Sequence, residues 1–334
     1  MVLSQEEIEK RVADSYELPN EVLKEVPDPI ISIRTSTYNH APYIRQCIEG
    51  VLMQKTSFPF EYIIGEDFST DETREIVFEY ARKYPNIIRV VTADYNVGSK
   101  ANGQRCIKRC RGKYMAICEG DDYWTDPLKL QKQVDFLESH EDYGLVHTMA
   151  KVYIDSQKKF KAQLQGRYFS HVDELIISNH IVTLTTCYRT EFYSRYVNDV
   201  HPSTSWKMGD YPMWIYISLH SKVHFIEEVT GVYRVLENSA SRSSCTQKNI
   251  DFCMSVYSIS KYFAEKYHKD YLLDDIKRYI QCLVAHTYVL YDKKVNLSTF
   301  RLFGRYLFTG RVLLISLFSV SKVGRTILRK RWTN

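Results

Sequence analysis

Several common sequence signatures are missing from this chain of 334 residues. Its eight cysteines include no Cys-x-x-Cys pair and its ten histidines form no HExxH pattern, so no common zinc motif is present. We therefore expect free, buried thiols in a reducing compartment. The N-terminus is acidic and amphipathic, without the apolar core of a signal peptide. No run of ~18 apolar residues occurs that could span a bilayer, and we expect a cytoplasmic protein.

The charge and the glycine pattern argue against two further classes of protein, nucleic-acid-binding proteins and nicotinamide dehydrogenases. The net charge of +5 is too small to indicate nucleic-acid binding, so no nucleic-acid partner is expected. No Gly-x-Gly-x-x-Gly follows the first expected strand, which argues against a nicotinamide dehydrogenase. The basic excess is uneven, because the stretch from Arg301 to Asn334 contains no Asp or Glu. A mild positive charge suits an anionic ligand or an anionic membrane surface.

Short apolar runs alternate with helical patterns over the first half of the chain. Strands are expected at 29–37, 60–65, 87–93 and 113–118, and helices at 43–54, 71–83, 100–111 and 127–139. This alternation predicts an α/β fold, with a mixed but mostly parallel sheet and helices on both faces. In such sheets ligands bind at the carboxyl ends of the strands.

The remaining segments are less regular and suggest three parts. Residues 145–154 and 182–188 are expected to be strands, 209–219 a helix, 223–235 a strand pair, and 247–308 successive helices. Residues 6–17 have the pattern of a short helix, and prolines 19, 27 and 29 then mark a linker. We expect an N-terminal helical extension (1–27), an α/β domain (28–240) and a helical C-terminal region with a basic tail (241–334).

Polar residues follow each of the first four expected strands, where a ligand would bind. They are Thr37 and Tyr38, then Glu66 and Asp67, then Asn96 and Gly98, and finally Glu119, Asp121, Asp122, Tyr123 and Trp124. A carboxylate at the second strand end can accept a hydrogen bond from the N–H of a base. At least one of the residues at 69–71 is expected to cap the next helix, whereas capping explains Glu66 and Asp67 less well.

The fourth cluster places three carboxylates, Glu119, Asp121 and Asp122, within four residues. Adjacent anions repel each other unless a cation lies among them, and oxygen ligands of this kind suit Mg²⁺ or Mn²⁺. A metal bound there and to a diphosphate would stabilise the charge on a departing nucleotide diphosphate. The alternative is an acidic loop that caps the helix after Asp126.

Together these segments resemble the successive motifs of inverting family-2 glycosyltransferases. They read ISIRTSTYNHAPYIRQCIEGVLMQ, EYIIGEDFSTDETREI, NVG and GKYMAICEGDDYWTDPLKLQKQ. The resemblance extends over 29–133 and resumes weakly over 208–234. It implies a GT-A-type catalytic domain at 28–240 that transfers a sugar, with inversion, from a nucleotide-diphosphate sugar to a hydroxyl on a glycan or lipid-linked glycan. Bacterial polysaccharide and glycolipid synthesis use such enzymes.

The resemblance also implies roles for individual residues. Thr37 and Tyr38 would line the base pocket, Glu66 and Asp67 would contact base or ribose, Asn96 and Gly98 would bind the nucleotide, and Glu119, Asp121 and Asp122 would form the DxD-type metal motif. Glu119 replaces the usual first Asp but keeps its charge. Tyr123 and Trp124 would contact donor or acceptor sugar, unless they pack in the core.

A catalytic base is expected later in the chain, in the segment Met208–Pro212. Inversion needs one carboxylate within hydrogen-bond reach of the attacking hydroxyl. Asp210 resembles that base, although it could instead cap the following helix; Asp199 is the weaker candidate. Family members often carry a His two residues after a Tyr-Arg pair, whereas here Leu236 follows Arg234, a phosphate-binding candidate. A non-catalytic nucleotide-sugar- or glycan-binding module on the same fold is therefore the alternative function.

The basic tail has the pattern of a membrane-surface segment. Residues 312–320 (VLLISLFSV) are apolar and are flanked on both sides by Arg or Lys. This arrangement is typical of a helix that lies on anionic lipid, which would place the protein peripherally on the inner face of the plasma membrane. Alternatively, the apolar residues pack back onto the domain.

Overall fold

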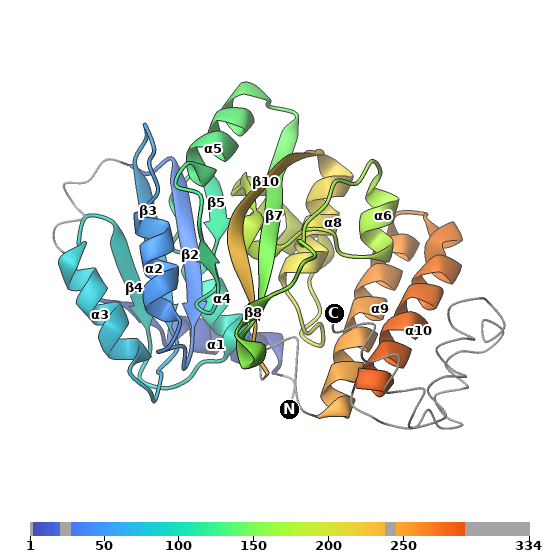
Figure 1. Ribbon diagram of the computed structural model, residues 1–334, viewed down its shortest axis with the longest axis horizontal. Helices are drawn as coiled ribbons and strands as arrows, with labels where there is room; N and C mark the ends of the chain where they lie inside the picture. The colour runs from blue at the N-terminus through green and yellow to red at the C-terminus, as the bar shows by residue number, and fades with distance from the viewer. Residues whose placement is uncertain (1–2, 21–27, 238–244, 291–334) are drawn as a thin grey trace.

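The computed structural model describes residues 3–20, 28–237 and 245–290, which form a central ten-stranded sheet with helices on both faces (Figure 1). Along the sheet the strands follow the order β1-β4-β3-β2-β5-β9-β7-β10-β6, and β8 pairs with β7. The strands are β1 (Tyr16–Glu17), β2 (Ile31–Thr37), β3 (Phe60–Glu66), β4 (Ile88–Thr92), β5 (Tyr114–Ile117), β6 (Tyr123–Trp124), β7 (Tyr143–Ile154), β8 (Lys159–Phe160), β9 (Cys187–Arg189) and β10 (Lys222–Val235). The mixed, mostly parallel sheet confirms the predicted fold class.

The described residues also form ten α-helices. They are α1 (Gln5–Ala13), α2 (Ile44–Leu52), α3 (Thr73–Lys83), α4 (Ser99–Ile107), α5 (Lys129–Ser139), α6 (Val172–Ile177), α7 (Glu191–Val200), α8 (Asp210–His220), α9 (Thr246–Lys266) and α10 (Leu273–Leu290). Most of them pack against the sheet, whereas α9 and α10 pack on α6 and α8. Strands β4, β3, β2 and β5 are parallel. The register pairs Thr37 with Glu66, so β2 and β3 end level with each other.

Two hydrophobic cores lie on opposite faces of the sheet. In β5, Tyr114 and Ala116 belong to the core beneath α2, α3 and α5, whereas Met115 and Ile117 belong to the core beneath α6 to α10. This alternation follows from the two-residue period of a strand. Because both faces are covered, the central strands β2, β3 and β5 are buried along almost their whole length, including polar residues such as Thr35 and Glu61.

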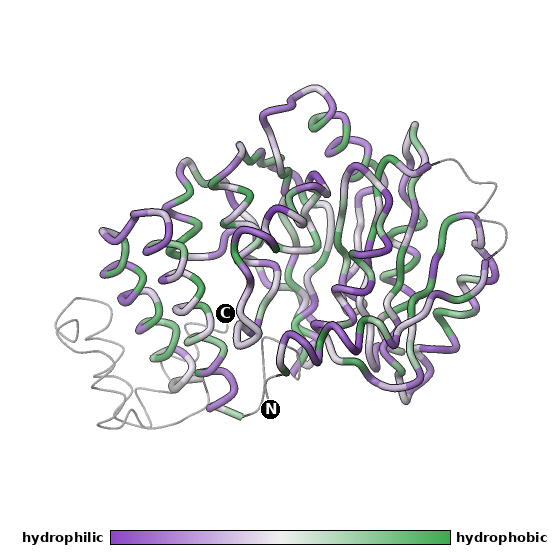
Figure 2. The backbone as a smooth tube through the Cα atoms, turned by 180° about the vertical axis from the view of Figure 1, so that it is seen from behind, coloured by the Kyte–Doolittle hydropathy of each residue, from purple (hydrophilic) through white to green (hydrophobic). Residues whose placement is uncertain are grey.

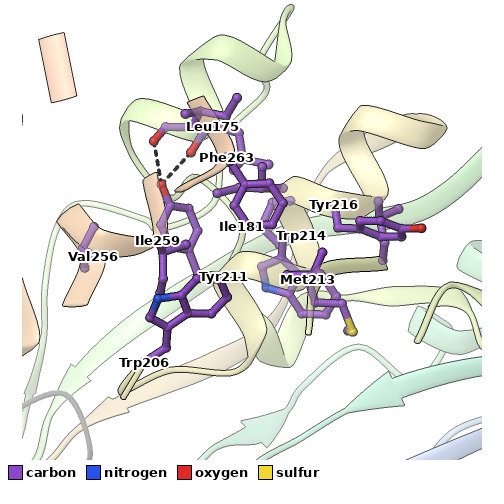
Figure 3. Close-up of a cluster of buried hydrophobic side chains, with 14 of the residues drawn as sticks. Leu175, Ile181, Trp206, Tyr211, Met213, Trp214, Tyr216, Val256, Ile259 and Phe263 are labelled. Atoms are coloured by element: carbon purple, nitrogen blue, oxygen red, sulfur yellow. Dashed lines mark hydrogen bonds between the residues drawn. The ribbon is translucent and has the colours of Figure 1, made fainter. Parts of the chain in front are cut away.

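The described part of the C-terminal region is helical, and α9 and α10 lie side by side (Figure 1). Hydrophobic and hydrophilic residues alternate along both helices (Figure 2), so that each presents an apolar stripe to the core. Figure 3 shows Tyr211 of α8 in that core, where its hydroxyl donates to the carbonyls of Leu175 (2.8 Å) and Ile176 (3.0 Å). The rest of the region, including the basic tail, lies outside the described residues.

The structure corrects the sequence-based prediction in three places. Residues 183–185 form a 3₁₀ turn, and the strand expected at 182–188 is reduced to β9. The strand pair expected at 223–235 is one long strand, β10, whose register against β7 shifts around Val229. The N-terminal extension is not only helical, because β1 pairs with β4. Among the described residues, no helix is both long and apolar enough to cross a membrane.

Candidate active site

A cavity of about 1660 Å³ is lined by most of the site residues that were predicted from the sequence. Its lining includes Thr37, Tyr38, Asp67, Asn96, Gly98, Glu119, Asp121, Asp122 and Asp210. These residues come from the ends of β2, β3 and β5, from the segment before α4, and from the start of α8. Four other nominated residues, Glu66, Tyr123, Trp124 and Arg234, do not line the cavity.

The end of β2 presents two buried polar atoms to the cavity. Thr37 Oγ1 and His40 Nδ1 have no hydrogen-bond partner within the described part of the chain. Both face Gly120, since a Cβ there would lie only 2.7 Å from Thr37 Oγ1 and 2.8 Å from His40 Nδ1. Buried polar atoms are normally paired, so this cradle is suited to a polar ligand group. Tyr38 lies beside it and is exposed.

Asp67, directly after β3, is hydrogen-bonded to the segment that carries the NVG motif (residues 96–98). Its carboxylate accepts hydrogen bonds from the backbone N–H groups of Val97 (2.9 Å) and Gly98 (3.0 Å). The Asn96 side chain returns to the carbonyl of Asp67 at 3.0 Å. Gly98 has a φ of +86°, a conformation that favours glycine, and it is the N-cap residue before α4. Burial raises the pKa of Asp67, while the two N–H groups oppose that shift.

The neighbouring Glu66 points away from the cavity. It is fully buried, and its carboxylate accepts the Ser69 N–H at 2.7 Å and pairs with Arg74 at 3.0 Å. Glu66 therefore orders the loop after β3. Asp71, two residues before α3, accepts the N–H of Thr73, the first residue of that helix, at 3.0 Å.

The three carboxylates after β5 have different surroundings. Glu119 pairs with Arg34 at 3.3 Å and accepts the Ser36 N–H at 3.2 Å. Burial raises the pKa of Glu119 against the attraction of Arg34, and the carboxylates of Asp121 and Asp210 raise it further. Asp122 is buried and accepts the Arg234 N–H at 2.7 Å. Burial and the charge of Asp121 raise its pKa well above the usual range.

Asp121 is the carboxylate best placed to bind a metal ion. Its side chain lines the cavity and makes no hydrogen bond or ion pair to any described residue. Over the described ranges, no three His, Cys, Asp or Glu side chains form a complete metal site. Mg²⁺-type cations are usually held by one or two carboxylates together with substrate phosphates and water, and this donor set fits that arrangement.

Arg234 of β10 holds the acidic loop, residues 119–122, from the side that faces away from the cavity. Its guanidinium donates to the Asp121 carbonyl and to Gln46 Oε1 (2.6 Å), and it lies between the rings of Tyr43 (4.7 Å) and Tyr123 (5.0 Å). These contacts direct the guanidinium away from the cavity, contrary to the expected phosphate contact. Leu236, two residues later, does line the cavity.

Trp124 does not occupy the expected sugar-contacting position. Only 2% of its surface is exposed, and its indole N–H donates to the Leu184 carbonyl at 2.7 Å. It packs in the core beneath α2. Tyr123 precedes it on β6 and covers Arg234 instead of lining the cavity.

Asp210 is the first residue of α8 and lines the same cavity. One carboxylate oxygen accepts the adjacent Tyr211 N–H at 2.8 Å, and the other accepts the hydroxyl of Thr183. Asp199 accepts the Tyr216 hydroxyl and does not line the cavity.

Comparison with known proteins identifies similar chains. An uncharacterized Mycobacterium tuberculosis protein is 36% identical over 207 residues, 61% of this chain and 58% of its own length. The putative teichuronic acid biosynthesis glycosyltransferase TuaG of Bacillus subtilis is 37% identical over 110 residues, 33% of this chain and 42% of its own. The chain thus spans little more than half the length of the first relative.

Two solved structures share the fold at low sequence identity. Staphylococcus aureus TarS, solved in complex with UDP-GlcNAc, matches with a TM-score of 0.58 and 18% identity over 91% of each chain. The mannosyltransferase PcManGT of Pyrobaculum calidifontis, solved with GDP-Man and Mn²⁺, matches with a TM-score of 0.55 and 13% identity, over 92% of this chain and 89% of its own. Residues 32–197 match the model of glycosyl transferase family 2. On these grounds the chain, with its GT-A-type sheet, belongs to the family-2 glycosyltransferases.

Proposed function

We propose that this protein transfers a sugar from a nucleotide-diphosphate donor to a hydroxyl group of a glycan or lipid-linked glycan, with inversion. The observation that carries this proposal is the single cavity that contains the Asp67–Gly98 hydrogen-bond pair, the unengaged carboxylate of Asp121 and the helix-start carboxylate of Asp210. These three features supply a nucleoside pocket, a metal ligand and a base in one cavity.

The nucleoside would bind between the ends of β2 and β3 and the start of α4. Thr37, Tyr38, Asp67 and Asn96 offer hydrogen-bond groups and an aromatic ring, and Gly98 lets the backbone approach the ligand. Glu66 supports this pocket from the buried side through Ser69 and Arg74. The nucleotide sugars bound in the TarS and PcManGT structures support this class of donor.

The acidic loop would hold Mn²⁺ or Mg²⁺ through Asp121, with Glu119 and Asp122 beside it. Such a cation, when bound, neutralises charge on the diphosphate of the donor. Arg234 contributes indirectly, because it holds the loop at the Asp121 carbonyl and the Asp122 carboxylate. The Mn²⁺ in PcManGT supports this assignment.

Asp210 would act as the general base. Its carboxylate takes the proton of the acceptor hydroxyl as the acceptor oxygen attacks the anomeric carbon. Attack occurs on the face opposite the leaving nucleotide diphosphate, so the configuration inverts. Thr183 and the Tyr211 N–H fix the orientation of the carboxylate.

A donor screen tests the proposal. Purified protein is incubated with UDP-sugars and GDP-sugars, with Mn²⁺ or with a chelator, and release of UDP or GDP is measured with and without glycan acceptors. Metal-dependent release is expected with at least one donor. Nucleotide binding without hydrolysis or transfer would instead favour a non-catalytic binding module. The observation behind this alternative is that Leu236, which lines the cavity, stands where family members often carry a His.

The location at an anionic membrane is proposed from the sequence of the basic tail, because residues 291–334 lie outside the described part of the chain. Each Lys or Arg near an anionic surface contributes about 1 kcal/mol. The full chain should sediment with anionic liposomes at low salt, whereas a chain truncated after Gly310 should not. Equal sedimentation of both would contradict this location.

A further inference from the structure

The N-terminal extension packs directly against the segment that carries the third motif. Its helix α1 lies on α4, and β1 extends the sheet beyond β4. Ile8 and Val12 of α1 form a small buried cluster with Ala93, Val97 and Ala101. Ile8 and Glu9 also line the active-site cavity beside Asn96 and Gly98. The extension therefore forms part of the cavity wall.

Val97 is held on both sides of its backbone. Its N–H donates to Asp67 Oδ1 at 2.9 Å, and its carbonyl accepts a hydrogen bond from the Arg11 guanidinium at 3.2 Å. Arg11 is itself oriented by Glu7, one helical turn away, at 3.0 Å. The next residue, Gly98, donates to the second carboxylate oxygen of Asp67 at 3.0 Å. Neither peptide group beside Val97 can rotate without losing one of these contacts.

Two tyrosines secure the start of the same segment. The hydroxyl of Tyr16 donates to Asp94 at 2.8 Å, and the hydroxyl of Tyr95 donates to Asp14 at 2.7 Å. The extension thus contacts the segment through residues 94, 95 and 97, while Asp67 holds it from the other side. Asn96, an exposed residue between these contacts, directs its side-chain amide at the Asp67 carbonyl.

We propose that Arg11 is a positioning residue for the donor: it fixes the Val97–Gly98 turn against Asp67 and thereby sets the affinity for the nucleoside. This inference rests on the proposed function, in which the nucleoside binds beside Asp67 and Gly98. Without Arg11 the turn has more conformations to lose on ligand binding, and that entropy cost lowers affinity. Arg11 touches neither the metal ligands nor Asp210, so the chemical step should be unaffected.

The test compares Arg11→Gln with wild type in the full chain. Calorimetry with UDP and GDP in the presence of Mn²⁺ should show nucleotide binding weakened about tenfold, because a hydrogen bond to a charged donor is lost. The KM for the donor should rise by a similar factor while kcat stays constant. Arg11→Lys keeps a cation within reach of the carbonyl and should recover part of the affinity.

Arg45→Gln is the matched control. Arg45 pairs with Glu79 at 2.9 Å, both side chains are about half exposed, and neither lines the cavity. This variant removes a helix-surface Arg–Glu pair like that of Arg11 and should bind nucleotide as the wild type does. Should Arg11→Gln fail to fold, Tyr95→Phe removes a single hydroxyl contact to the extension and should weaken binding about threefold.

Four results would overturn the inference. Wild-type affinity in a folded Arg11→Gln would show that the extension does not position the turn, and the proposed function would stand. An equal loss in Arg45→Gln, or a fall in kcat at unchanged donor affinity, would assign Arg11 a general structural role. If the wild type bound neither UDP nor GDP, the proposed function would fail and this inference with it.

Discussion

The backbone N–H of Arg234 donates a hydrogen bond to the carboxylate of Asp122 across 2.7 Å and so joins β10 to the acidic loop. The guanidinium of Arg234 donates to the Asp121 carbonyl in the same loop. One residue therefore holds the backbone and one carboxylate of the loop, while the Asp121 carboxylate stays unengaged. Such support from a rigid strand fixes a ligand-binding group before the ligand arrives.

Asp121→Ala should abolish the Mn²⁺-dependent part of UDP or GDP binding while leaving the fold intact. The carboxylate has no partner among the described residues, so its removal should change the free energy of unfolding by no more than about 0.5 kcal/mol. Calorimetry with Mn²⁺ and with EDTA measures the binding. The control is Asp142→Ala, which removes a surface carboxylate that pairs with Lys222. Unchanged Mn²⁺ dependence in Asp121→Ala would exclude its metal role.

Asp210→Asn should lower kcat by about 100-fold or more and leave donor affinity near that of wild type, because an amide cannot accept the proton of the acceptor. The amide oxygen can still accept one of the two hydrogen bonds that orient the side chain. Steady-state kinetics and calorimetry separate the two effects. Asp199→Asn is the control; if it were the inactive variant and Asp210→Asn the active one, the roles of the two residues would be exchanged.

Two helical glycines should respond to alanine with opposite signs. A Cβ at Gly50 of α2 would lie 2.9 Å from the backbone N of Trp124, so Gly50→Ala should destabilise the protein by about 1–3 kcal/mol. A Cβ at Gly103 of α4 meets its nearest atom at 3.9 Å, and Gly103→Ala should stabilise by about 0.5–1 kcal/mol. Urea unfolding measures both changes. Stabilisation by Gly50→Ala would contradict the close approach of α2 to β6.

His147 should make the protein less stable at acidic pH. It is completely buried, and burial lowers its pKa from 6.5 to about 3, with His180 and His224 adding to that shift. Between these two values the unfolded chain binds a proton that the folded chain does not, so stability falls as pH falls below 6.5. For this residue the loss from pH 7.5 to pH 5.0 is about 2 kcal/mol.

His147→Leu should remove that part of the pH dependence, as measured by urea unfolding at the two pH values. Val152→Ala is the control, because it removes a buried side chain of the same strand that carries no titratable group, and it should show the same difference between the two pH values as wild type. If His147→Leu retained the full wild-type difference, His147 would not be the source of the acid sensitivity.

The rule that ligands bind at the carboxyl ends of parallel strands could be applied from sequence alone, because each of these strands is a short β-type run followed by polar and turn residues. It placed Thr37, Asp67, Gly98 and Asp121 at one edge of the sheet, and the structure brings all four to one cavity. The segment that starts α8 was recognised from the family resemblance. It reaches the cavity through packing against 3₁₀ turn residue Thr183, 27 residues earlier in the chain.

What the sequence could not provide was the direction of each side chain. Glu66 and Asp67 are consecutive, and only tertiary partners such as Arg74 decide which of them faces the cavity. Trp124 is buried because its indole N–H reaches Leu184, 60 residues later. Arg11 gave no local signal at all, since the carbonyl that it contacts lies 86 residues away. His40 was adjacent to a motif, but its unpaired buried nitrogen becomes evident only in three dimensions.

The two outermost strands of the sheet, β1 and β6, are each only two residues long. A long exposed edge strand offers unpaired N–H and C=O groups onto which another chain can add, and short edge strands are one way in which proteins avoid such aggregation. At one end, β1 covers part of β4 at Thr92 and Val91. Loss of residues 1–17 would uncover β4 and create a site for strand addition, so the extension also protects this sheet from self-association.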